Sequence, residues 1–237
     1  MKKFVCIKHW LFVAIVLGEI SYASAQPVNY SFSFTNGFNN GGAIPDGNVT
    51  GWSDTRVISG IPGTNDGTSE ILDVNVLLTL SGGFNGDLYG YLVHSSGFAV
   101  LLNRPGRTGG NAFGYSDAGM NLKFDDSAAN GDIHQYQSVG GYAVSLNDGS
   151  AWAPDGRNVN PATVNGTETS TSLLASFNGL DLNGSWTLFL ADLSVGETST
   201  VAHWGVEVVA APEPATWALF GIGLACGGWR FLRRRVS

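Results

Sequence analysis

The stretch that decides the fold is Ile71–Gly106, ILDVNVLLTLSGGFNGDLYGYLVHSSGFAVLLNRPG. Its first part has apolar residues at positions 74, 76, 78 and 80, with other residues between them. This alternation is the pattern of a strand with one buried face. Glycine-rich turns at 82–86 and 95–97 then separate two more strand-like segments, Leu88–Val93 and Phe98–Leu102. The stretch therefore predicts three strands joined by two turns.

The rest of the chain supports an all-β fold. Gly184–Asp192 is rich in β-forming residues, and Val201–Val209 places Trp204, Val206 and Val208 on one face. No segment between the two ends of the chain has convincing helical periodicity. Short strands at close spacing, many glycines and few charges predict a β-sandwich. A propeller is the alternative, but no blade repeat is visible.

The first 25 residues have the three parts of a secretory signal peptide. Lys2, Lys3 and Lys8 form a basic start, an apolar core follows at 10–18, and Ala23-Ser24-Ala25 is a small-residue cleavage site. We expect cleavage after Ala25. A retained membrane anchor is the alternative, but the apolar core is short.

The last 26 residues also have three parts. A Pro-Glu-Pro motif is followed by a 15-residue apolar run, 215–229, and by a basic end. A spanning helix needs about 20 residues, and a snorkelling arginine can extend a short one. We expect a single transmembrane helix with its arginine-rich end in the cytoplasm, rather than a buried C-terminal helix. The sorting residues are Pro212, Glu213, Pro214, Arg230, Arg233, Arg234 and Arg235.

This tail resembles the PEP-CTERM sorting signal of Gram-negative bacteria, over residues 212–237. The resemblance implies that an exosortase-type transpeptidase recognises and removes the tail, so the inner membrane holds the chain only transiently. Proteins with this signal are exported, often in bacteria that make extracellular polysaccharide. The resemblance therefore implies a final place at the cell surface or in the extracellular matrix.

The predicted mature domain, residues 26–211, is strongly acidic. Of the 12 basic residues, three lie in the signal peptide and four in the tail, which leaves five. Of the 19 acidic residues, only Glu19 and Glu213 lie outside, which leaves 17 and a net charge of about −12. Nucleic acid and anionic lipid are poor partners for such a surface, whereas divalent cations suit it. Solubility after export is the alternative explanation.

The mature domain contains no cysteine, because Cys6 and Cys226 lie in the two ends. Its stability must then come from core packing, with bound metal as a second source. A zinc site is not indicated, because His94, His134 and His203 share no ligand spacing.

Two blocks of the mature domain resemble the P domain, or Homo B domain, of kexin- and furin-like proprotein convertases. The first joins 73–76 to Asn85-Gly86-Asp87-Leu88 and 100–102. The second joins 183–188 to Ala191-Asp192 and 203–206. The resemblance spans about residues 44–209 and implies a jelly-roll β-sandwich.

The chain also departs from the P-domain pattern. Residues 81–83 are Ser-Gly-Gly where convertases often have a histidine, and the segment 111–162 is longer and richer in glycine. The subtilisin-like catalytic segment that carries the family's protease activity is not seen in this chain. A Gly-x-Ser-x-Gly nucleophile motif is also absent. We therefore expect a non-catalytic protein.

Calcium is the cofactor that the residues favour, because it binds several carboxylate and carbonyl oxygens, and bacterial relatives of the P domain often bind it. Asp87 could instead close its turn by a hydrogen bond to the backbone, and Asp125 and Asp126 could form a solvated turn. The candidate ligands flank the strands of the two blocks: Asp73, Asp87, Asp125, Asp126 and Asp192.

The tryptophans divide into two groups. Trp186 and Trp204 lie in strand-like segments and are expected in the core. Trp52 and Trp152 lie in turn-rich sequence and could contact a ligand such as a sugar.

Three roles remain open for the predicted module. The first is adhesion or structure at the cell surface or in the matrix, with surface proteins or extracellular polysaccharide as partners. The second is an accessory role beside a separate serine endopeptidase. The third is carbohydrate binding, which rests on analogy of fold alone.

Overall fold

The computed structural model describes residues 26–62, 70–140 and 145–211. The predicted signal peptide and the predicted transmembrane helix, 1–25 and 212–237, lie outside the described residues. Within those residues, no helix has the length and apolar character needed to cross a membrane.

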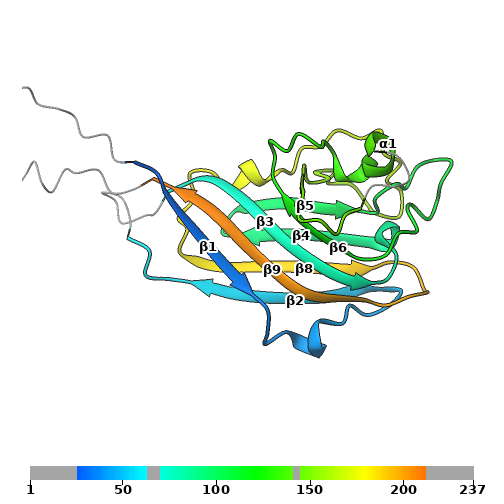
Figure 1. The fold of residues 1–237 in the computed structure, drawn as a ribbon, viewed down its shortest axis with the longest axis horizontal. Coiled ribbons are helices and arrows are strands. Elements are labelled where there is room, and N and C mark those ends of the chain that lie inside the picture. The colour runs from blue at the N-terminus through cyan, green and yellow to red at the C-terminus, as the bar shows by residue number, and fades with distance from the viewer. Residues whose placement is uncertain (1–25, 63–69, 141–144, 212–237) are drawn as a thin grey trace, which may run out of the picture.

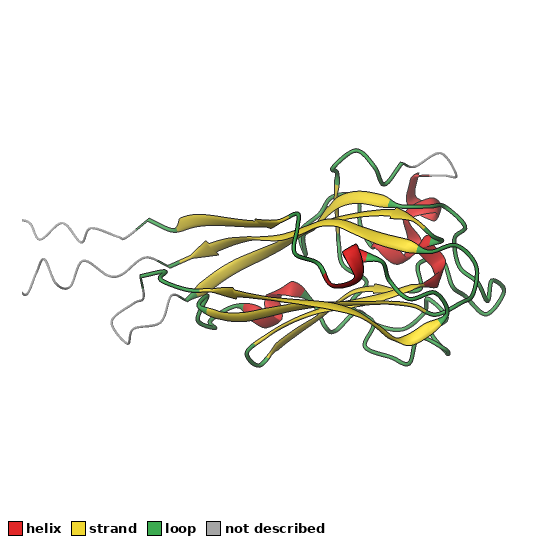
Figure 2. Ribbon diagram, turned by 90° about the horizontal axis from the view of Figure 1, so that it is seen from below, coloured by secondary structure: helices red, strands yellow, loops and turns green. Residues whose placement is uncertain are grey.

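The described chain forms two sheets packed face to face (Figures 1 and 2), which confirms the predicted all-β sandwich. Neighbouring strands are antiparallel except the parallel pair β6–β7. The five-stranded sheet has the order β1 (Val28–Phe34), β9 (Ser199–Ala210), β3 (Ile71–Gly82), β6 (Met120–Phe124) and β7 (Ala151–Trp152). The four-stranded sheet has the order β2 (Asn48–Ile58), β8 (Gly184–Asp192), β4 (Leu88–His94) and β5 (Gly97–Asn103).

The three strands predicted in the opening stretch are β3, β4 and β5. β3 lies in the five-stranded sheet, whereas β4 and β5 form a hairpin in the other, so the connection between β3 and β4 crosses from one sheet to the other. A short 3-10 helix, η2 (Asn85–Asp87), forms this crossing. The tight β4–β5 turn places Ser95 at a positive φ of 53°.

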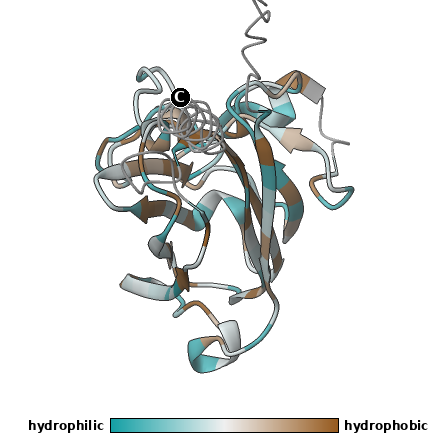
Figure 3. Ribbon diagram, turned by 90° about the vertical axis from the view of Figure 1, so that its left-hand side faces the viewer, coloured by the Kyte–Doolittle hydropathy of each residue, from teal (hydrophilic) through white to brown (hydrophobic). Residues whose placement is uncertain are grey.

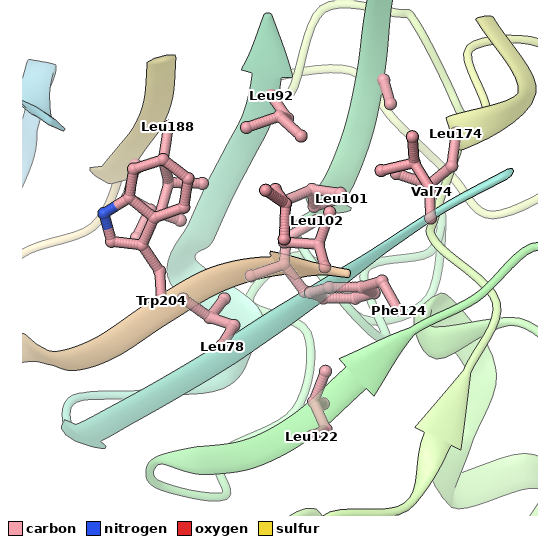
Figure 4. Packing of buried hydrophobic residues seen from close by; sticks show 14 of the residues in the cluster. Val74, Leu78, Leu92, Leu101, Leu102, Leu122, Phe124, Leu174, Leu188 and Trp204 are labelled. Atoms are coloured by element: carbon pink, nitrogen blue, oxygen red, sulfur yellow. The ribbon is translucent and has the colours of Figure 1, made fainter. Parts of the chain in front are cut away.

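The core lies between the sheets and follows the alternation in the sequence. Val76 and Leu78 of β3 are fully buried, as are Leu92 and Leu188 of the other sheet. Figure 4 shows Leu78, Leu92 and Leu188 in this core. Hydrophobic and hydrophilic bands alternate along the strands in Figure 3. Each apolar strand therefore buries one face, as period-two patterning requires.

The predicted core tryptophans are confirmed. Trp186 and Trp204 are both fully buried. Their indole N–H groups are satisfied: Trp186 donates to the Leu182 carbonyl at 3.1 Å, and Trp204 donates to Asp54 Oδ2 at 2.7 Å. An indole N–H group that is buried without an acceptor destabilises the folded protein. These two hydrogen bonds therefore allow the large rings to fill the core.

The other helical pieces are short and lie in connections. They are η1 (Asn39–Gly42), η3 (Ile133–Gln135), α1 (Tyr136–Gly140) and η4 (Leu174–Phe177). The sandwich itself is therefore built by strands, with helices only at its edges.

Candidate functional site

One end of the sandwich gathers several connections. The end that holds the first residues of β1 and the last residues of β9 is where the described chain enters and leaves, since Val28 pairs with Ala210. At the opposite end, on the right in Figure 1, β3 turns into β4 and β8 turns into β9. We call this opposite end, formed by residues 83–87, 104–119 and 193–198, the distal pole.

The distal pole contains a preformed pocket of about 270 Å³. Its surface is mainly apolar. Asp87 and Ser194 supply polar groups, and Phe113 and Val195 remain 74% and 84% exposed beside it. An apolar cavity with a few fixed polar groups is the usual form of a small-ligand or side-chain site. The aromatic side chains that line it are Phe84, Phe113 and Tyr115.

Two glycines position the pocket loop. Gly86 N donates to the Tyr115 carbonyl at 2.8 Å, and Tyr115 N donates to the Pro105 carbonyl at 2.9 Å. A Cβ at Gly86 would lie 2.4 Å from the Phe113 carbonyl oxygen, and Gly114 has a φ of +75°. Because only glycine allows this approach, the loop 104–119 packs directly on η2.

Asp87 is the predicted site residue that the structure places in this pocket. Its side chain pairs with Arg104, whose Nη2 lies 3.1 Å from Asp87 Oδ1, and both residues are buried. Arg104 Nη2 also donates to Ser194 Oγ at 3.0 Å, and its Nε donates to the Gly86 carbonyl at 3.0 Å. The carboxylate of Asp87 therefore has a cation partner, and that partner belongs to the same chain.

The sequence did not single out Arg104. The residue has a φ of +54°, which is uncommon for a residue other than glycine, and its N–H donates to the Leu88 carbonyl at 2.8 Å. Burial lowers the pKa of its guanidinium, although the charge of Asp87 opposes this shift. The only sequence signal was its place in a basic, glycine-rich loop.

Asp192 lies beside this pair and is fully buried. Its Oδ1 accepts a bond from Ser194 N at 3.3 Å, and its Oδ2 has no hydrogen-bond partner. Burial, with the charges of Asp87 and Asp46, raises the pKa of Asp192 to about 6. Asp46 in turn accepts from Gly196 N at 3.0 and 3.1 Å, so two carboxylates hold the turn between β8 and β9.

The other three predicted metal ligands lie elsewhere and are engaged by the protein. Asp125 Oδ1 accepts from Ser127 N, and Asp126 accepts from the N–H groups of Leu174 and Ala175 at the start of η4. Partial burial, followed by the charges of Asp125 and Asp126, raises the pKa of Asp73. The five candidates thus fall into two separate places rather than one.

These residues do not form a recognisable calcium site. Among the described residues, no group of three or more His, Cys, Asp or Glu side chains is arranged to hold a metal ion. Calcium binding stays a prediction. The predicted ligand that still has an unpartnered buried oxygen is Asp192.

A buried histidine network lies next to the pocket loop. His134 Nδ1 lies 2.7 Å from Asp155 Oδ2, and its Nε2 lies 3.0 Å from the Arg107 carbonyl. Burial lowers the pKa of His134, but the hydrogen bond and charge of Asp155 outweigh it, so the net shift is upward. A catalytic histidine needs its second nitrogen free for a nucleophile. In this structure the Arg107 carbonyl occupies the second ring nitrogen, so His134 connects the loops that carry Arg107 and Asp155.

The placement of Trp52 and Trp152 in loops was wrong. Trp52 lies in β2 and Trp152 in β7, and each is only 3% exposed. Their indole N–H groups donate to the Asn39 carbonyl at 2.9 Å and to Ser150 Oγ at 3.2 Å. With both rings inside the protein, neither has an open face for a sugar.

The described molecule is thus a β-sandwich with a preformed distal pocket. The family model for the PEP-CTERM protein-sorting motif matches residues 210–235, which confirms the predicted sorting signal. This motif indicates an exported protein that is held in the membrane before processing by an exosortase-type enzyme.

A sequence search of the curated proteins finds no significant match. Two solved structures match this chain at low similarity. A crystal structure of Aeromonas sobria serine protease with its chaperone covers 79% of this chain at 14% identity, with a TM-score of 0.44. A structure of the protease from Aeromonas sobria covers 78% at 13% identity, with a TM-score of 0.42. This chain spans 27% of the length of each matched chain. The P-domain resemblance stays a prediction.

Proposed function

We propose that this protein is an exported, non-catalytic binding module that the sorting tail delivers to the cell surface or extracellular matrix. The observation that carries the proposal is the sorting motif at 210–235, which starts at the last residue of β9. The inner membrane and the exosortase-type enzyme are then transient partners of the tail, and the sandwich is the part that acts outside.

The position of the pocket relative to the tail supports a binding role. β9 runs from Ser199 at the distal pole to Ala210 at the opposite end. A strand rises about 3.3 Å per residue, so these twelve residues span roughly 40 Å. Before the tail is removed, the pocket would therefore lie at the end farthest from the membrane, and an attachment made near Ala210 during processing would leave it free.

The chemistry of the described residues favours binding over catalysis. The buried pair His134–Asp155 has no nucleophile on the second ring nitrogen, and the pocket at the distal pole pairs its carboxylate with Arg104. A pocket whose lining carboxylate is already paired with a cation is suited to holding an apolar group rather than to transferring protons.

The proposal is tested by following the tail in the native host. Replacement of Pro212, Glu213 and Pro214 by alanine should leave the tail uncleaved and the protein in the inner-membrane fraction, whereas the wild-type chain should lose its tail and reach the surface. Intact mass and cell fractionation measure both results.

A pocket variant is the matched control. Phe113→Ala changes an exposed side chain of the distal pole, so we expect normal cleavage of its tail but weaker retention at the surface. If the tail variant is processed like the wild type, the sorting part of the proposal is wrong. If Phe113→Ala is retained like the wild type, the pocket has no part in binding.

A further inference from the structure

The outer face of the four-stranded sheet carries a cluster of aromatic rings. Tyr91 of β4 stacks on Phe189 of β8 with centroids 4.7 Å apart, and it meets Phe98 of β5 at 5.3 Å. Tyr89 lies 5.9 Å from Tyr91 along the same strand. The rings are half-buried, and they form a continuous row across three neighbouring strands. We call these four residues the aromatic row.

The strand register places this row outside the core. Leu92 and Leu188 alternate with the ring-bearing residues and are fully buried between the sheets. β2 leaves room for the row: Gly51 has a φ of +60°, and a Cβ there would lie 2.6 Å from the ring of Phe189. The alternation of the strands therefore directs these rings outward, whichever rotamer each side chain adopts.

Hydroxyl groups border the row on the side of β2. Thr55 Oγ1 and Thr187 Oγ1 share a hydrogen bond of 2.8 Å, and both residues point outward. Ser53 pairs with Phe189 across the strands and is exposed. The face thus combines apolar ring surface with groups that both donate and accept hydrogen bonds.

The face has no charged residue at its outward positions. Residues 53, 55 and 57 of β2, 185, 187 and 189 of β8, and 89, 91 and 93 of β4 include no Asp, Glu, Lys or Arg. The outer face of the other sheet carries Asp73, Lys123 and Glu207, the last two paired at 3.7 Å. On a domain with a net charge of about −12, an uncharged face matches an uncharged partner.

We propose that the aromatic row binds a neutral polysaccharide chain. A sugar ring has an apolar C–H face that fits an aromatic surface and a rim of hydroxyl groups that fits the Ser and Thr border. Strands lie about 4.8 Å apart, so a row across three strands is roughly 10 Å wide and can contact more than one sugar unit. This inference rests on the proposed export, which brings the face into contact with extracellular polymer.

The test uses the full chain in a polyoxyethylene detergent, which has no sugar headgroup to compete. Native gels containing dextran, galactomannan or soluble β-glucan should retard the wild-type protein, whereas alginate, an acidic polymer, should not. Tyr91→Ala and Phe189→Ala should each weaken retention at least tenfold. Leu72→Ala shortens an exposed side chain of β3, in the other sheet, and should bind polysaccharide like the wild type.

A second variant keeps the test decisive if a ring deletion fails to fold. Ser53→Glu places a charge on an exposed position beside Phe189 and should also weaken retention. Lack of retardation by all three neutral polymers would overturn the proposal. So would sedimentation showing a dimer that Tyr91→Ala dissociates without any glycan binding, because the face would then join two copies. Tail cleavage is measured separately, so either result leaves the proposed export standing or failing on its own evidence.

Discussion

At the scale of single residues, the pair Asp87–Arg104 shows what a buried charge needs. Asp87 is 5% exposed and Arg104 is 7% exposed, so water solvates neither group well. The pair is held at 3.1 Å, and Arg104 makes further bonds to Gly86 and Ser194. These bonds offset the loss of hydration, and removing one partner would leave the other charge uncompensated.

We expect Arg104→Met to lower the free energy of unfolding by about 3–5 kcal/mol, because it leaves Asp87 buried without a cation. Methionine keeps much of the apolar side chain, so the change isolates the charge. Chemical denaturation of the purified protein measures the loss. Lys123→Met is the control, because the exposed pair Lys123–Glu207 at 3.7 Å should contribute at most about 1 kcal/mol. Equal losses for the two variants would contradict a buried pair.

Single residues also show what could and could not be predicted from the sequence. Asp87 could be singled out because it follows a glycine turn and begins a strand. Its partner is 17 residues away in the sequence and reaches it only because β4 and β5 pair. Trp52 was assigned to a loop. Its strand exists because β2 pairs with β8, more than a hundred residues later.

At the scale of elements, alternation predicted β3, whereas β5 was predicted from a short apolar run between turns. β4, most of β3 and the first part of β8 bury every second residue. The aromatic row was missed for a related reason. Tyr89 and Tyr91 were assigned to a strand, but sequence alone does not say that Phe98 and Phe189 lie beside them on the solvent face.

The pocket loop depends on glycine at η2. We expect Gly86→Ala to displace the loop 104–119, because the new Cβ would lie 2.4 Å from the Phe113 carbonyl oxygen and 2.5 Å from Tyr115 N. Overpacking of this kind costs about 1–3 kcal/mol. Hydrogen exchange should show lost protection at Tyr115, whose N–H donates to Pro105.

Gly109→Ala is the matched control within the same loop. A Cβ at Gly109 would meet no atom within 4 Å, and its φ is not in the left-handed region. We expect its stability to stay within about 0.5 kcal/mol of the wild type. If Gly86→Ala behaved like this control, the close contact between η2 and the loop would not be required.

At the scale of the whole molecule, the titratable groups set a direction for stability with pH. Asp192 has a folded-state pKa of about 6, raised by burial, whereas an unfolded Asp ionises near 3.9. The folded state therefore binds more protons than the unfolded state between about pH 4 and 6, and stability falls as pH rises through this window. The pKa of His134 is also raised in the folded state, so its contribution to stability is lost at still higher pH.

Measuring Tm with and without calcium tests whether Asp192 binds this ion. An ion bound to the ionised Asp192 would offset its buried charge and raise Tm at neutral pH, by an amount that grows with the logarithm of the ratio of ion concentration to dissociation constant. An increase with millimolar calcium that Asp192→Asn abolishes would support the ion at this residue. An unchanged Tm would remove calcium as a stabilising ligand.

We expect Tm of the wild-type protein to fall from pH 4.5 to pH 8 and Asp192→Asn to flatten the part of this fall below pH 6. A shift of about two pKa units corresponds to roughly 3 kcal/mol, so the variant should gain several degrees in Tm at pH 8. His134→Gln is the second arm, because its contribution is complete below its ordinary pKa near 6.5 and is lost as pH rises through the higher folded-state pKa. It should therefore destabilise the protein most at pH 5.

The acidic surface acts in the same direction, since self-repulsion grows as carboxylates ionise. Salt weakens that repulsion but screens buried groups much less. A pH profile of Tm that becomes flat in 0.5 M salt would therefore assign the effect to the surface. One that persists would assign it to buried groups, and the two variants then show how much of it belongs to Asp192 and to His134.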